Sequence, residues 1–286
     1  MSQVSRRGFM GGAMGAAAAG YLSRGALELR GDPLGMPIGC QSYTVRDVIG
    51  KDFPGTLKML AGVGFRTLEM CSPAGYATSG FGPLAKMKAA EIRQAINAAG
   101  LRCESSHFQF QELRQNLEER IAWSKEMGLT QMIVSTFALP NNAAMDDWMR
   151  AADTLNKIGE QIERAGIQLG FHNHNFEFRL IDGALVYDKL MGQLDGKLVK
   201  MQFQVAVIDQ GYEAATYLTK YPGRFLSLHL ADWSSAEKKQ VPIGKGVVDW
   251  TKLFAAARTG GVKNYFVEMD LDLMKASIPY LHELKA

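Results

Sequence analysis

The segment IQLGFHNHNFEF, residues 167–178, decides how the rest of the chain is interpreted. It opens with an apolar run and closes on two histidines, His172 and His174, two positions apart. Because side chains alternate across a strand, both imidazoles are expected to point to the same face. Such a strand end can bind a metal, transfer a proton or hold a polar ligand. A hydrogen-bonded structural pair is the alternative.

The same order, a short apolar run and then a helical pattern, repeats along the chain. The apolar runs lie at 37–43, 67–71, 102–108, 131–137, 167–174, 199–207, 225–230 and 264–269. The stretches with helical periodicity lie at 56–63, 83–99, 117–127, 145–165, 184–194, 213–221, 250–258 and 273–284. This alternation predicts an α/β fold, a single (β/α)8 TIM barrel over residues 34–286. A doubly wound open sheet is the alternative, but no Gly-x-Gly-x-x-Gly turn follows the first run.

Polar residues gather where the predicted strands end, which is where barrel enzymes build their active sites. The candidates by this criterion are Gln41, Tyr43, Glu69, His107, His172, His174, Gln202, Gln204, His229, Glu268 and Asp270. Each alone has an ordinary structural explanation. Burying several imidazoles and carboxylates without partners is costly, and a bound metal or polar substrate would remove that cost. The set as a whole therefore predicts a functional site.

The chemistry of these residues suggests a metal. His172, His229 and Glu268 offer two nitrogens and a carboxylate, which suits Mn, Zn, Fe or Co better than Ca. Gln204 is expected to add a weak neutral oxygen. Three ligands plus water would make an open site of the catalytic kind.

The first residues predict export. Ser5-Arg6-Arg7-Gly8-Phe9-Met10 resembles a twin-arginine signal, and the weakly apolar stretch 11–22 that follows is too short to span a bilayer stably. We expect residues 1–33 to be a signal peptide and leader, and the protein to be periplasmic or secreted. An ordinary basic amino terminus is the alternative. No later segment is long and apolar enough to cross a membrane.

The net charge and the cysteine content restrict the classes of partner and the disulfide bonds that we expect. The net charge of +3 is small and no basic stripe is visible, so no nucleic-acid partner is expected. The three cysteines, Cys40, Cys71 and Cys103, cannot all pair within one chain and are interpreted as buried thiols. A Cys40–Cys71 bridge and a homo-oligomeric state both stay open.

On this barrel pattern the chain resembles the xylose isomerase-like superfamily and, within it, the sugar phosphate isomerase/epimerase group. That group includes inosose dehydratases and 3-keto-glycoside epimerases and lyases. The segments that carry the resemblance are 172–178, 221–224, 228–232, 243–250 and 266–268. The resemblance implies a divalent metal, Mn, Zn, Mg or Co, held by His172, Gln204, His229 and Glu268. The family pattern has an acid where this chain has Gln204, which removes one negative charge from the metal site.

The resemblance also implies a function: an exported carbohydrate isomerase, epimerase or lyase acting on a keto-sugar or 3-keto-glycoside. Proton abstraction next to the carbonyl would be assisted by the metal. The predicted catalytic residues are Glu268, His107, His174 and Glu69. The predicted substrate-binding residues are Gln41, Tyr43, Asp232 and Lys245, with a small-molecule sugar as the partner.

Two other functions stay in view. With Gln204 in the sixth-strand position, one alternative is a barrel that holds sugar without a metal and without turnover. The superfamily also contains endonucleases that cut DNA with a larger metal cluster and a basic face. The near-neutral charge and the export signal argue against the second of these.

Overall fold

Eight parallel strands close on themselves in the computed structural model, which describes residues 32–284. Around the barrel they run β1, β12, β9, β8, β5, β4, β3 and β2. Their bounds are β1 (Gly39–Gln41), β2 (Thr67–Cys71), β3 (Arg102–Phe108), β4 (Gln131–Val134), β5 (Gln168–His172), β8 (Val199–Gln204), β9 (Phe225–Leu230) and β12 (Asn264–Val267). The predicted (β/α)8 TIM barrel is confirmed.

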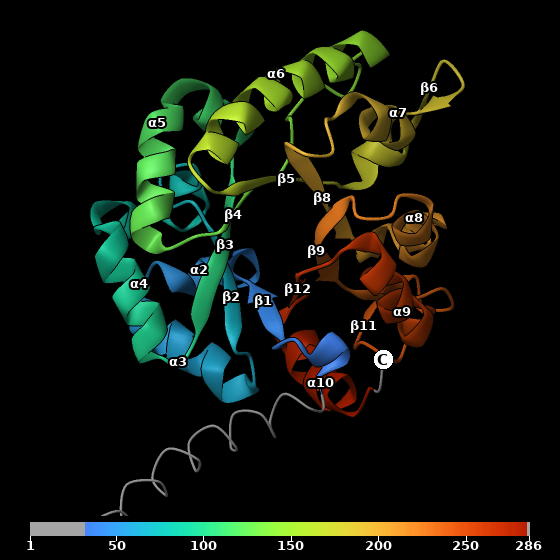
Figure 1. The fold of residues 1–286 in the computed structure, drawn as a ribbon. Coiled ribbons are helices and arrows are strands. Elements are labelled where there is room, and N and C mark those ends of the chain that lie inside the picture. Colours follow the sequence, from blue (N-terminus) through green and yellow to red (C-terminus); the bar gives the residue numbers. More distant parts are fainter. Residues whose placement is uncertain (1–31, 285–286) are drawn as a thin grey trace, which may run out of the picture.

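Helices surround the strands on the outside of the barrel (Figure 1). They are α2 (Arg46–Ile49), α3 (Phe53–Val63), α4 (Ala89–Ala98), α5 (Phe110–Met127), α6 (Met145–Arg164), α7 (Val186–Gln193), α8 (Ala214–Lys220), α9 (Trp250–Gly260) and α10 (Leu271–Glu283). Helix α6 shows why they form: Trp148, Leu155 and Ile162 recur at helical spacing and are buried. Such a face packs on the barrel and leaves the charged face to solvent.

Five predicted strands end earlier than expected, and three of them are followed by a 3-10 helix. After β1 the chain enters Ser42–Val45, and after β8 it enters Val205–Gln210. In both places a glutamine side chain accepts a backbone N–H two residues on: Gln41 from Tyr43, and Gln204 from Ala206. After β5 the chain turns at His174 into a similar helix.

The strand register places the inward polar side chains at matching heights. Gln41 lies opposite Glu69, which in turn lies opposite Ser105. On the other side of the barrel Gln204 lies opposite His229. Below this layer Gly39 has no room for a side chain, since a Cβ atom there would lie 2.6 Å from the Phe266 ring. The barrel interior is therefore tightly packed on the amino-terminal side of this layer, and the layer itself is polar.

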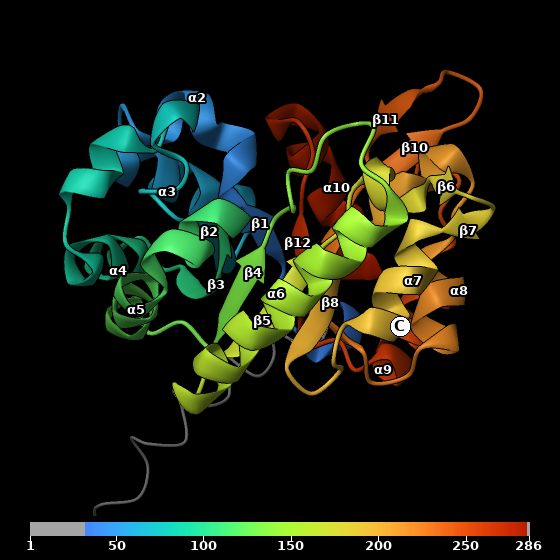
Figure 2. The same cartoon turned by 90° about the horizontal axis from the view of Figure 1, so that it is seen from above.

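Additional elements collect at the carboxyl ends of the strands. Helix α2 follows β1, the ribbon β6 (Leu180–Ile181) with β7 (Ala184–Leu185) follows β5, and the ribbon β10 (Asp232–Ser234) with β11 (Lys239–Val241) follows β9. Figure 2 shows α2 and the β10–β11 ribbon at the same end of the barrel. This end carries the loops that surround the polar layer.

The opposite end of the barrel is closed by the first described residues. Asp32 is buried and bonds to Nδ1 of His282 in α10, with 2.6 Å between the two atoms. The Tyr265 hydroxyl donates to the carbonyls of Pro33 and Met36 at 3.3 and 3.0 Å. Residues 32 and 33, which the sequence assigns to the leader, thus pack against the barrel. The predicted twin-arginine motif lies outside the described residues.

The three cysteines are free, as expected: Cys40 and Cys71 are buried and Cys103 is half-buried. A Cys40–Cys71 bridge is therefore absent. Across residues 32–284, no helix combines the length and the apolarity needed to cross a membrane.

Candidate active site

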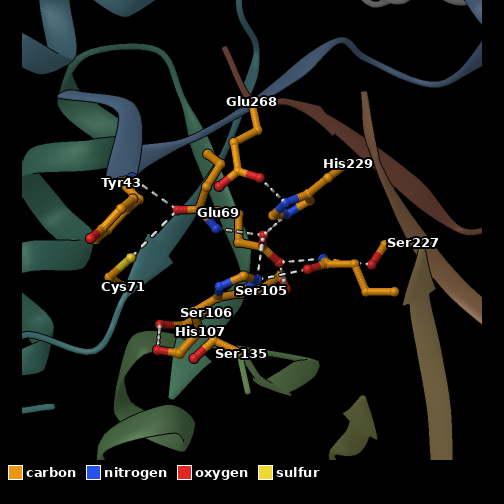
Figure 3. A network of polar contacts seen from close by, with 12 residues as sticks. Tyr43, Glu69, Cys71, Ser105, Ser106, His107, Ser135, Ser227, His229 and Glu268 are labelled. Atoms are coloured by element: carbon orange, nitrogen blue, oxygen red, sulfur yellow. Dashed lines mark hydrogen bonds and ion pairs between the residues drawn. The ribbon is translucent and has the colours of Figure 1, made fainter. Parts of the chain in front are cut away.

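A single carboxylate, Glu69, lies at the centre of the polar layer (Figure 3). It is fully buried, and its Oε1 accepts from Ser105 Oγ at 2.5 Å and from Gln202 Nε2 at 2.9 Å. Its Oε2 accepts from Gln41 Nε2 at 2.6 Å and lies 2.5 Å from His229 Nε2. Burial would raise the pKa of Glu69, but the neighbouring imidazoles outweigh it and hold this pKa well below its usual range.

His229 bridges two carboxylates. Its Nε2 faces Glu69 and its Nδ1 lies 2.8 Å from Glu268 Oε2. Burial would lower the pKa of His229, but Glu268 and Glu69 together raise it to about 10. Burial would likewise raise the pKa of Glu268, but His229 lowers it to about 2. At neutral pH this arrangement is an imidazolium held between two carboxylates, and binding a cation through His229 would require the loss of one of its protons.

Gln204 turns its amide nitrogen toward the site. Its Nε2 donates to Glu268 Oε2 at 2.5 Å, and its Oε1 accepts from the backbone of Ala206 at 3.2 Å. A carboxylate accepts and an amide NH2 donates, so this orientation follows from the partners on each side. The sequence suggested Gln204 as an oxygen ligand for a metal. In the structure that oxygen is engaged with the backbone, and Gln204 instead holds Glu268.

Three buried imidazoles do come together. His107 on β3, His172 on β5 and His229 on β9 offer nitrogens that all lie within 4.8 Å of one another. Nδ1 of His172 is buried without a hydrogen-bond partner. Burial, reinforced by the other histidines, places the pKa of His172 well below its ordinary value, so this imidazole is neutral and has a free lone pair.

The tautomer of His107 is set by Gln202. The Gln202 amide nitrogen donates to Glu69 and, at 2.8 Å, to Ser227 Oγ, so its oxygen must accept. The group that donates to it is Nε2 of His107, 2.6 Å away. Because Nε2 of His107 carries the proton of this bond, Nδ1 is the His107 nitrogen that could take a metal.

The structure thus describes a ligand set that fits a divalent cation but differs from the predicted one. His172 and His229 belong to both sets. His107, predicted as a catalytic residue, joins them, while Glu268 lies outside the three-histidine cluster and the Gln204 oxygen is bonded to the backbone of Ala206. Three nitrogen donors suit Zn, Co or Fe better than Mg.

His174 lies next to His172, between the buried cluster and the surface. Their ring centroids are 4.7 Å apart, which confirms that both imidazoles point to one face. His174 is half-buried and its Nδ1 has no hydrogen-bond partner. Burial lowers the pKa of His174 to about 4, so it is neutral at pH 7. Glu177 fixes its backbone by accepting from the His174 N–H at 2.7 Å.

Asp232, a predicted substrate-binding residue, is bonded to the loop that follows its own ribbon. Its buried carboxylate accepts from Trp250 Nε1 at 2.9 Å and from the backbone of Gly244 at 2.9 Å. It also accepts from the backbone of Trp233, Gly246 and Val248. Three of these five donors, Gly244, Gly246 and Val248, lie in the loop after β11, so Asp232 fixes that loop to the start of β10.

The other predicted substrate-binding residues are placed at different depths. Gln41 is fully buried and its amide is bonded to Glu69. Tyr43 lies on the rim after β1 and is 36% exposed. Lys245 is exposed on the loop that Asp232 holds. Of these, Tyr43 and Lys245 are placed where a ligand could meet them.

Sequence reasoning assigned no role to three residues that complete the network. Ser105 and Ser227 hold Glu69 and Gln202, and Gln202 holds His107. The signal was present, since Ser105 and Ser227 each lie two positions before a candidate histidine and so share its face.

Curated relatives of this chain are inosose dehydratases. The protein from Lacticaseibacillus casei is 24% identical over 161 residues, covering 49% of this chain and 53% of the relative. The one from Bacillus cereus (strain AH820) is 27% identical over 161 residues, with coverage of 49% and 53%. The matched stretch spans about half the length of these relatives.

Solved structures share the fold. A sugar phosphate isomerase/epimerase from Parabacteroides distasonis ATCC 8503 superposes with a TM-score of 0.72 at 23% identity, over 86% of this chain and 94% of that one. An L-ribulose 3-epimerase gives a TM-score of 0.61 at 15% identity, over 86% and 94%. The family described as "Xylose isomerase-like TIM barrel" matches residues 57–278, well over half of the sequence. The chain therefore belongs to the xylose isomerase-like TIM barrel family.

Proposed function

We propose that this protein is an enzyme that abstracts a proton next to a sugar carbonyl, leading to isomerisation, epimerisation or elimination on a keto-sugar or 3-keto-glycoside. The observation that carries the proposal is an ionised carboxylate at the carboxyl ends of the strands, held by His229 and Gln204 and with the neutral His174 nearby. Glu268 is the carboxylate, and its side chain is 21% exposed. The names of the relatives, inosose dehydratase and L-ribulose 3-epimerase, support sugar as the substrate class.

Glu268 is the base in this proposal. With a pKa of about 2 it is ionised but intrinsically weak, so the carbonyl has to be activated for the proton to leave. A divalent cation at His107, His172 and His229 would polarise that carbonyl and stabilise the enediolate. His229 and Gln204 fix the direction of the carboxylate through their bonds to its Oε2.

The remaining residues orient the substrate and the base. His174 is neutral and half-buried, and its unpartnered Nδ1 is available to a sugar hydroxyl or to a proton in transit. Glu69 was predicted to transfer protons, but it is fully buried beneath His229, so we assign it the positioning of that imidazole. Lys245 and Tyr43 lie outside, where substrate enters.

Replacing Glu268→Gln should abolish proton exchange, because an amide cannot accept the proton. In D2O, NMR of inosose and of 3-keto-glucosides should show deuterium entering next to the carbonyl with the wild type. The variant should slow this by at least about 100-fold. Asp270→Asn, an exposed acid two positions along, is the matched control and should exchange normally. Undiminished exchange in Glu268→Gln would refute its role as base.

The affinity for a divalent metal should depend on the three histidines of the cluster. His107→Ala and His172→Ala should each lose more than the roughly 10–100-fold in affinity that removal of a supporting residue costs. Gln204→Asp should bind more tightly, since it adds a negative charge near the cluster. Metal content and titration with Zn, Co, Mn and Mg would measure this, with circular dichroism confirming the fold. A folded wild type that holds no metal, and gains no activity with Mn, would overturn the metal-assisted mechanism.

A second candidate function is sugar binding without metal or turnover. A continuous chain of bonds from Glu69 through His229 to Glu268 and Gln204 favours this function. Each of these four side chains already has a hydrogen-bond partner without a metal. In that case the protein would bind sugars in the presence of EDTA, and deuterium exchange would be absent.

The bridging histidine should make stability fall with rising pH. The His229 pKa is raised from 6.5 to about 10, so its stabilisation is complete below 6.5 and is lost as pH rises toward 10. His172 and His174 act in the opposite sense, but only near and below their ordinary pKa of 6.5. The free energy of unfolding of EDTA-treated protein should therefore drop by at least about 1.4 kcal/mol per pH unit between about pH 7.5 and 8.5, and the three thiols, whose pKa values burial raises, add to the fall. Urea denaturation that gives a flat or rising profile there would exclude the charged bridge.

We propose in addition that the protein is exported through the twin-arginine route to the periplasm or the medium. The support is the sequence motif at Arg6 and Arg7. Changing both to lysine should retain the protein in the cytoplasm, as cell fractionation would show. Equal cytoplasmic amounts of wild type and variant would disprove this route.

A further inference from the structure

His174 begins a short segment that neighbouring parts of the barrel hold at several points. It is the residue before the 3-10 helix Asn175–Phe178, and its backbone is extended, with φ −123° and ψ −164°. Its ring centroid lies 4.7 Å from that of His172. Within residues 32–284, Nδ1 of His174 is buried and has no hydrogen-bond partner, so no bond from that atom fixes the ring. The direction of the imidazole therefore depends on how the backbone at His174 is held.

A buried acid holds that backbone. Glu177 is fully buried, and its Oε2 accepts the His174 N–H at 2.7 Å, three residues back along the chain. This bond caps the start of the 3-10 helix in the way that a glutamate caps an α-helix. Among the described residues, the other oxygen of Glu177, Oε1, has no hydrogen-bond partner. Burying a carboxyl group in this way is costly, and its burial supplies the bond to His174.

The bond from His174 needs an acceptor at position 177 and does not need a charge there. Burial raises the pKa of Glu177 to about 7, so at neutral pH a large part of the protein carries the neutral acid. A protonated carboxyl group still offers an acceptor oxygen, and so does an amide of the same size. Glutamine can therefore take the place of Glu177 in this bond, whereas leucine cannot.

The next residue of the segment is anchored in an aromatic cluster. The buried Phe178 has its ring centroid 4.7 Å from that of Tyr187 and 4.6 Å from that of Tyr212. Tyr187 belongs to α7, and Tyr212 follows the 3-10 helix after β8. The Tyr212 hydroxyl also donates to the Phe178 carbonyl at 3.1 Å. Apolar burial and a hydrogen bond together fix the position next to Glu177.

Arg179 joins the same segment to the loop that follows β4. Its guanidinium donates to the backbone carbonyls of Asn141 and Ala143, the second at 3.1 Å. It also lies 5.5 Å from the ring centroid of Trp148, a buried side chain of α6. A planar guanidinium can donate through two nitrogens and stack on a ring at the same time. The loops after β4 and β5 are thus held together by one side chain.

We propose that Glu177 and Arg179 are positioning residues for His174. Glu177 fixes the backbone from which the imidazole extends, and Arg179 fixes the end of the same 3-10 helix to the rim of the barrel. Glu177 is fully buried and Arg179 is engaged with the backbone, so both act through the segment. The assignment rests on the proposed function, in which His174 meets a sugar hydroxyl or a proton in transit.

NMR of labelled histidines would test the positioning without any turnover. The chain has five histidines, so labelling Cε1 with 13C gives five signals, and His174→Ala identifies the signal of His174. In Glu177→Leu this signal should shift or broaden, while that of His282, at the other end of the barrel, stays in place. Glu177→Gln should keep the wild-type spectrum, because its amide oxygen accepts the same N–H. Glu91→Leu is the matched control, since it removes the equivalent capping bond at the start of α4, 2.9 Å long.

A double-mutant cycle would show whether the effect on the reaction passes through His174. Glu177→Leu and Arg179→Met should each lower kcat/KM for deuterium exchange by about 10- to 100-fold, the cost of a misplaced catalytic group. Glu177→Gln should restore the rate. In a His174→Ala background either substitution should cost less than about twofold, because the imidazole that it positions is gone.

The outcomes separate the positioning role from the proposed function. An unmoved His174 signal in folded Glu177→Leu overturns the positioning role, whether or not any sugar is turned over. Losses of the same size in the wild-type and His174→Ala backgrounds also overturn it, since a merely structural effect would persist there. If Glu177→Leu does not fold, as judged by circular dichroism, Glu177→Asp and Arg179→Met take its place in both measurements. A shifted His174 signal in a protein without deuterium exchange supports the positioning and removes the proposed function.

Discussion

A carboxylate buried inside the barrel organises everything above it. Glu69 takes hydrogen bonds from Gln41, Ser105, Gln202 and His229, which stand on four other strands. A buried charge without partners would destabilise the fold severely, so these strands are held in the register that supplies the donors. The positions of His229 and, through it, Glu268 follow from that requirement. The arrangement of the site thus depends on a carboxylate that is fully buried beneath it.

The architecture could be predicted because periodicity is a property of the chain itself. Every predicted strand and helix overlaps one in the structure. The strand ends were less predictable, as at Gln41 and Gln204, whose side chains bond to the backbone two residues on and divert it into a 3-10 helix. A glutamine late in a strand can face the barrel, the solvent or its own backbone, and sequence alone does not distinguish these.

The residue types of the site were also predictable, but their pairings were not. His172, His229 and Glu268 could be identified as site residues because they lie at the ends of predicted strands. The carboxyl ends of barrel strands all meet at one end of the barrel. Which atom faces which depends on the register between strands distant in sequence. Gln204 illustrates this: its amide can offer an oxygen or an N–H, and the carboxylate beside it selects the N–H. For Asp232, the partners come from a loop whose path no local pattern reveals.

The barrel closes by pairing its first strand with its last, as Gly39 lies beside Phe266. Asp32 and His282 join the same two ends of the chain. Closure of this kind is the most non-local contact a chain can make, and such contacts form slowly because the intervening segment must be ordered first. Nascent chains emerging from a ribosome would therefore hold an open, unfinished sheet until nearly all the sequence had been made. The polar layer, which needs both β2 and β9, would assemble only at that last stage.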